Sequence, residues 1–93
     1  MIFVINNLKY DTDKMKLISY KCEYQYTSQY TSITFVAQDV RLFKSIKGNW
    51  LLAYKANYGN DIGRALTEEE AKQLLLNYDL EVYEKLFGEL EEA

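Results

Sequence analysis

The 93-residue sequence contains no histidine, no proline, four glycines and one cysteine. Without histidine, it lacks the usual base of a Ser-His or Cys-His pair and the commonest nitrogen ligand of zinc. Cys22 has no partner for a disulfide within the chain, so the protein is not expected to be a disulfide-stabilised scaffold. We expect Cys22 to be buried and to pack as a small hydrophobic residue. The glycines form no phosphate-binding loop. These absences predict a protein that is not an enzyme and holds no metal or cofactor.

Long hydrophobic runs are also missing. No stretch approaches the roughly 20 apolar residues of a membrane-spanning helix, and the start, MIFVINNLKY, lacks the features of a signal peptide. We therefore expect a cytoplasmic protein with no membrane partner. The composition, 48% hydrophobic and 27% charged, is that of a globular protein. A chain of this length predicts a single domain, 1–93.

Residues 1–58 have the pattern of a mostly β region. In the segment 1–10, strand-forming residues flank Asn6-Asn7, a pair that tolerates the positive φ of a tight hairpin turn. A second hairpin is predicted around the turn 47–49. Its far strand begins at Trp50 and has apolar residues at successive positions. We expect this strand to be covered on both faces near its start, with Trp50 in the core.

Between these hairpins, residues 17–26 alternate in polarity, which is typical of a half-buried antiparallel strand. One face holds Ile18, Tyr20, Cys22, Tyr24 and Tyr26.

Tyr20 and Tyr24 are therefore predicted to pack within the sheet. A polar segment, 27–32, predicts a loop that would present Tyr26 and Tyr30 outward, which makes these two tyrosines candidates for contact with a partner. A short strand is predicted at 33–36, and a loop at 57–63.

The last third of the chain changes to a helical period. Thr67 and Glu70 form a capping-box pattern, and the apolar residues that follow recur at i, i+3, i+4 and i+7. Asp79 is placed to cap a second helix, which either continues to about residue 90 or ends at Gly88. Strands first and helices last predict an α+β fold: an antiparallel β-sheet of four to five strands, followed by two C-terminal helices (67–90) packed on one face.

Charge is divided along the chain. Residues 1–66 contain nine Lys or Arg and five Asp or Glu, a net +4, whereas residues 67–93 contain two Lys and nine Asp or Glu, a net −7. Either the acids simply solubilise the helices, or they form a surface that binds a basic protein groove, even one that normally receives DNA phosphates. The helical period turns Glu69, Glu81 and Glu84 toward water, which makes them candidate partner-binding residues.

Three segments carry a resemblance to a known family: NNLKYDTD (6–13), RLFKSIKGNWLLAY (41–54) and LTEEEAKQLLLNYDLEVYEKLFGELEEA (66–93). They resemble the "NGKKYDT", "LYRTKKGNWFL" and "LSEEEAKEWL…YEKLFG" patterns of small uncharacterised proteins of bacteria, phages and mobile elements. Phe43 stands where that family often has tyrosine or arginine, and Leu75 stands near its usual tryptophan. The resemblance implies a mobile-element context but carries over no catalytic residue.

Three functional hypotheses follow. The first is a protein-binding module that acts on a host or defence-system protein, such as an anti-CRISPR inhibitor. The alternative is a nucleic-acid-binding domain that uses a basic, tyrosine-rich sheet. The third is an accessory protein that forms a homodimer through an exposed strand.

Overall fold

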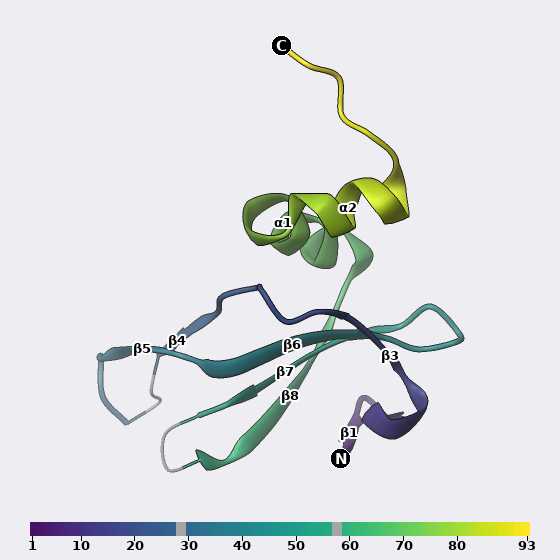
Figure 1. Ribbon diagram of the computed structural model, residues 1–93. Coiled ribbons are helices and arrows are strands. Elements are labelled where there is room, and N and C mark those ends of the chain that lie inside the picture. The colour runs from purple at the N-terminus through teal and green to yellow at the C-terminus, as the bar shows by residue number, and fades with distance from the viewer. Residues whose placement is uncertain (28–29, 57–58) are drawn as a thin grey trace.

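The computed structural model describes residues 1–27, 30–56 and 59–93, and shows an α+β fold. A four-stranded antiparallel sheet lies at its centre, with two-stranded sheets beside it and two C-terminal helices on one face (Figure 1). The strands are β1 (Ile2–Ile5), β2 (Leu8–Asp11), β3 (Lys16–Ser19), β4 (Gln25–Thr27), β5 (Thr34–Val36), β6 (Gln38–Lys44), β7 (Trp50–Lys55) and β8 (Asp61–Leu66). The helices are the 3-10 turn η1 (Thr12–Lys14), α1 (Glu68–Tyr78) and α2 (Leu80–Phe87).

The central sheet has the strand order β3-β6-β7-β8, and every neighbouring pair is antiparallel. In β7, all residues from Trp50 to Tyr54 are buried, which confirms that this strand is covered on both faces. Trp50 is 2% exposed, so its predicted place in the core is confirmed.

The helices cover one face of this sheet. Ala71 and Leu75 of α1 are fully buried against the sheet, and Phe87 of α2 approaches the Trp50 ring with a centroid distance of 6.3 Å. The buried residues of this core are Cys22, Ala37, Val40, Leu42, Trp50, Leu52, Tyr54, Ala71 and Leu75.

The N-terminal hairpin, β1 and β2, covers the opposite face. Its predicted turn is confirmed, since Asn6 and Asn7 have φ values of 51° and 63°. Phe3 packs against Gly63 of β8, and Tyr10 joins Phe43 in a second core with Leu51 and Ala53. The sheet is thus enclosed between a helical layer and a hairpin layer.

The predicted continuous strand 17–26 is wrong. The register of β3 against β6 shifts between Leu17 and Ser19, so Ile18 is an extra residue in the ladder. One extra residue reverses the alternation after it. As a result Ser19 turns inward and is 3% exposed, while Tyr20, predicted to pack within the sheet, is 73% exposed.

The predicted loop 57–63 is also wrong in part. Asp61, Ile62 and Gly63 belong to β8, which pairs with β7 along its whole length. Glycine is rare in strands, which is why this segment was predicted as a loop. Here glycine is required within the strand, because the Phe3 ring lies over Gly63 and leaves no space for a side chain. Asn57 and Tyr58 lie outside the described residues.

The helix boundaries largely follow the sequence signals. Both hydrogen bonds of the Thr67–Glu70 capping box are present, at 3.1 and 3.0 Å, as predicted. Asp79 occupies the N-cap position of α2, but the prediction that it caps the helix is wrong: its carboxylate makes no cap bond and instead accepts a 2.6 Å hydrogen bond from the Ser19 hydroxyl. Gly88, with a φ of 99°, ends α2, so the helical region stops short of residue 90.

Candidate functional site

The predicted aromatic surface forms a packed cluster. Tyr26 lies in β4, half-buried, and its ring stacks on those of Tyr54 and Phe35 at 5.7 Å each. The Tyr24 ring lies 4.9 Å from Tyr54. Tyr26 is therefore not in an outward-facing loop as predicted, because its ring contributes to packing between β4, β5 and β7. Tyr30, between β4 and β5, is 88% exposed.

A cleft lies between this cluster and helix α1. Its volume is about 250 Å³. The lining residues are Tyr24, Leu52, Arg64, Leu66, Glu70, Gln73, Leu74 and Asn77.

Arg64 holds one wall of the cleft in place, since its Nη1 donates a 3.1 Å hydrogen bond to the Tyr24 hydroxyl and its guanidinium lies 5.8 Å from the ring centroid. The backbone amide of Thr67, and Arg64 to a smaller degree, lower the pKa of Glu70 at the rim. The cleft therefore has leucines inside and polar groups at its rim, which suits one inserted side chain of a partner.

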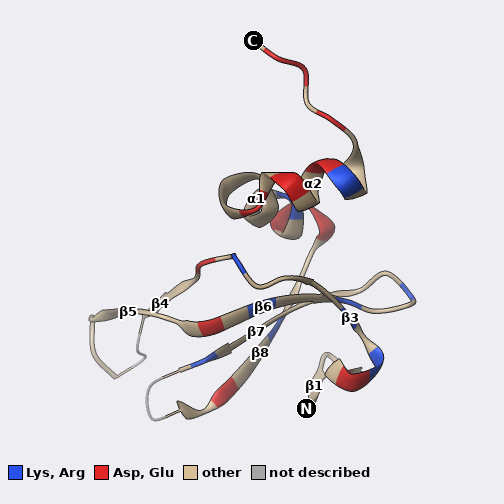
Figure 2. Ribbon diagram, in the orientation of Figure 1, with Lys and Arg blue, Asp and Glu red and all other residues tan. Residues whose placement is uncertain are grey.

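The acids of the helical region gather outside this cleft. Figure 2 shows red segments along α1, α2 and the C-terminal tail. We call the exposed members the acidic helical surface: Glu68, Glu69, Glu81, Glu89, Glu91 and Glu92.

Only loose ion pairs offset this charge among the described residues. Glu69 lies 3.9 Å from Lys72, and Glu81 lies 3.7 Å from Lys85. Exposed pairs of this kind contribute little stability, so both glutamates remain available to a partner. Glu84 differs from its predicted outward placement: it is half-buried, and its Oε2 accepts a 3.1 Å hydrogen bond from the backbone N–H of Leu90. This hydrogen bond fixes the backbone of the tail at Leu90 to helix α2.

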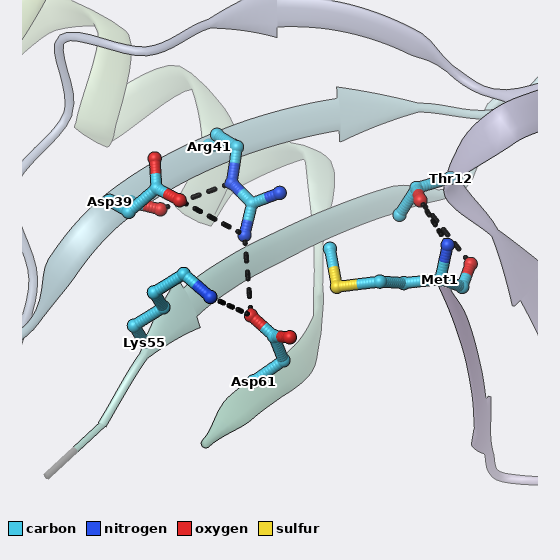
Figure 3. Close-up of polar contacts among 6 residues, drawn as sticks. All are labelled: Met1, Thr12, Asp39, Arg41, Lys55 and Asp61. Atoms are coloured by element: carbon cyan, nitrogen blue, oxygen red, sulfur yellow. Dashed lines mark hydrogen bonds and ion pairs between the residues drawn. The ribbon is translucent and has the colours of Figure 1, made fainter. Parts of the chain in front are cut away.

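Part of the positive charge of the β region is already neutralised. Arg41 Nη2 lies 3.7 Å from a carboxylate oxygen of both Asp39 and Asp61, and Lys55 lies 3.1 Å from Asp61 (Figure 3). This four-residue cluster has no net charge. Figure 3 also shows Thr12 bonded to Met1, which ties the start of β1 to η1.

No family model, curated protein or solved structure matches this chain. Within the ranges 1–27, 30–56 and 59–93, no group of three or more Cys, Asp or Glu residues is placed to hold a metal ion. The helices described are all too short or too polar to cross a membrane.

Sequence reasoning identified the acids but missed the cleft beside them. The cleft depends on Arg64 meeting Tyr24, residues 40 positions apart, and on β8, which the sequence did not predict. The one available signal was Arg64, a basic residue between the small residues Gly63 and Ala65.

Proposed function

We propose that this protein is a small, non-enzymatic protein-binding module that binds a basic partner through the acidic helical surface. The observation that carries this proposal is the gathering of six exposed glutamates on α1, α2 and the tail, with only two loose ion pairs among them in the described part of the chain (Figure 2). A surface of one sign attracts a partner of the opposite sign and speeds association.

The cleft beside α1 offers a place where a side chain of the partner can be buried, which an acidic surface alone does not provide. Charged rims set the rate and specificity of association, whereas affinity comes mainly from a few side chains buried in pockets. Glu70 and Gln73 lie at the rim of the cleft, and Glu69 lies on the same helix. A partner that places an apolar side chain on Leu66 and Leu74 would bring its neighbouring basic residues against α1.

The biological setting of this proposal rests on the family resemblance. That resemblance favours a phage or mobile-element protein that acts in the cytoplasm of a bacterial host and inhibits a defence system, as anti-CRISPR proteins do. Defence nucleases bind nucleic acid through basic grooves, and an acidic surface of a small protein is electrostatically complementary to such a groove.

The geometry weighs against the alternative of a tyrosine-rich sheet that binds nucleic acid. Base stacking needs exposed ring faces. Tyr20 and Tyr30 are exposed, but neither lies in a strand of a sheet. Tyr26 is stacked against two neighbouring rings, and the central sheet is covered by helices on one face and by the β1–β2 hairpin on the other.

The test begins with affinity capture from a host lysate, with and without nuclease. We expect the same protein partner in both samples. The double variant Glu69→Lys/Glu81→Lys should then slow association with that partner about tenfold or more at low salt, and added salt should slow the parent protein in the same way.

Glu23→Lys is the matched control for each single variant, Glu69→Lys and Glu81→Lys, because it makes the same charge change at an exposed acid outside the helical surface. It should leave the association rate almost unchanged. Thermal unfolding should show that all variants remain folded. If the double variant binds like the parent, the glutamates only solubilise the helices, and the exposed Tyr30 becomes the better candidate. A partner lost on nuclease treatment would instead support nucleic-acid binding.

A further inference from the structure

Two adjoining grooves lie at the end of the central sheet where β3 begins and β6 turns into β7. Their volumes are about 510 and 490 Å³. Both are lined by Lys14, Met15, Ser45 and Ile46, so they meet along a shared ridge. The β1–β2 hairpin closes one groove with Leu8, and α2 closes the other with Leu86.

This end of the molecule is strongly basic. Five lysines and two aspartates line the grooves: Lys9, Lys14, Lys16, Lys44, Lys47, Asp11 and Asp13. Figure 2 shows blue segments at the start of β3 and in the β6–β7 turn.

Unlike Arg41 and Lys55, none of these five lysines forms an ion pair with another described residue. Lys44 lies 5.0 Å above the Trp50 ring, and Asp11 accepts a hydrogen bond from the backbone of Asp13. The grooves therefore present an excess of three positive charges, the difference between five lysines and two aspartates, that the described part of the fold does not neutralise.

The walls between the lysines are apolar. Ile46, at the tip of the β6–β7 turn, is 96% exposed, and Leu8 and Leu86 are each nearly half exposed. The one aromatic residue in the lining, Tyr10, is 7% exposed and has no free ring face for a base. Aliphatic walls with a lysine rim suit aliphatic side chains flanked by carboxylates better than they suit unstacked bases.

We propose that these grooves bind an extended acidic segment of a partner protein, in which aliphatic side chains alternate with glutamate or aspartate. The carboxylates would pair with Lys14 and Lys47, and an aliphatic side chain would pack on Met15 and Ile46. This surface is separate from the acidic helical surface and has the opposite charge. The proposal therefore adds a second interaction that does not depend on the first.

The test measures fluorescence anisotropy of a labelled synthetic peptide of repeating Glu-Leu-Glu-Glu units, titrated with the full chain. We expect saturable binding that weakens about tenfold in Lys14→Glu, or about 1.4 kcal/mol. Lys21→Glu is the matched control: it makes the same charge change at an exposed residue outside both grooves, and it should leave the affinity almost unchanged.

Ile46→Ser separates apolar contact from charge. Because Ile46 is almost fully exposed, this change should not alter the unfolding midpoint. It should weaken binding of the Glu-Leu-Glu-Glu peptide but not of a matched peptide with serine in place of each leucine. Absence of peptide binding, or equal losses in Lys14→Glu and Lys21→Glu, would overturn the proposal. Tighter binding to oligothymidine, or to phosphatidylserine vesicles, would overturn it in favour of a phosphate-binding surface.

Discussion

Replacing Gly63 with alanine tests how the N-terminal hairpin sits on the sheet. Gly63 lies in the edge strand β8, directly beneath the Phe3 ring of β1. A Cβ atom at this position would lie 2.5 Å from Cγ of Phe3, and 2.7 and 2.8 Å from its two Cδ atoms. Carbon atoms in contact prefer about 3.5–4.0 Å, so the ring, and the hairpin that carries it, would have to move.

Two opposing effects determine how Gly63→Ala changes the free energy of unfolding. Overpacking of this kind costs about 1–3 kcal/mol, whereas alanine in a strand is favoured over glycine by about 0.5–1 kcal/mol. The difference of the mid-range values predicts that Gly63→Ala lowers the free energy of unfolding by about 1.25 kcal/mol. Without the ring only the second effect remains, so in a Phe3→Ala background Gly63→Ala should raise the free energy of unfolding by about 0.75 kcal/mol.

Urea unfolding of the four proteins in this cycle, followed by the fluorescence of Trp50, measures both numbers. The expected coupling between the two positions is about 2 kcal/mol, well above the usual error of additivity of about 0.3–0.5 kcal/mol. The reasoning would be refuted if Gly63→Ala stabilised the protein equally with and without the Phe3 ring. That result would mean that the hairpin does not pack on β8.

Three further changes have expected outcomes. Trp50→Ala should lower the free energy of unfolding by about 3–5 kcal/mol, measured by urea titration with circular dichroism, and an unchanged midpoint would contradict its burial. Thr67→Ala should cost about 1 kcal/mol through loss of the helix cap, whereas Thr67→Ser should be nearly neutral; equal losses would show that the hydroxyl is not the cause. Burial, with a smaller contribution from Asp79, raises the pKa of the Cys22 thiol above its ordinary value of 9.0, although the Ser19 hydroxyl opposes this. The folded state therefore favours the protonated thiol, and its contribution to stability is lost as pH rises above about 9 through the folded pKa. Native protein should react slowly with iodoacetamide at pH 8 and rapidly in urea, and Cys22→Ala should reduce the loss of stability at high pH.

The features that the sequence predicted correctly depend on short-range signals. The turn at Asn6-Asn7 and the capping box at Thr67 each need only a few neighbouring residues. The double burial of β7 followed from its continuous apolar run. Three of the five candidate binding residues, Tyr30, Glu69 and Glu81, are exposed as predicted. No local signal showed that Glu84 would accept a hydrogen bond from the tail or that Tyr26 would stack in an aromatic cluster.

The features that sequence reasoning missed depend on residues far apart in the chain. Ser19 bonds Asp79 across 60 positions, and this buried pair accompanies the bulge that turns Tyr20 outward. Similarly, Gly63 led to the prediction of a loop where β8 begins, because the packing of the Phe3 ring over this glycine cannot be read from the local sequence. In both cases local propensity was overridden by a tertiary contact.

The strand order also has a consequence for how the chain folds. β6, β7 and β8 pair with their neighbours in sequence, whereas β3 pairs with β6 across β4 and β5. Short loops close faster than long ones, so we expect the β6–β8 meander to form early and the N-terminal elements to dock late. During synthesis the hairpin would emerge before the central sheet but would have nothing to cover until β8 is complete. Gly63→Ala should then speed unfolding without slowing folding, because the clash with Phe3 arises only after the hairpin docks. Stopped-flow measurements can check both rates.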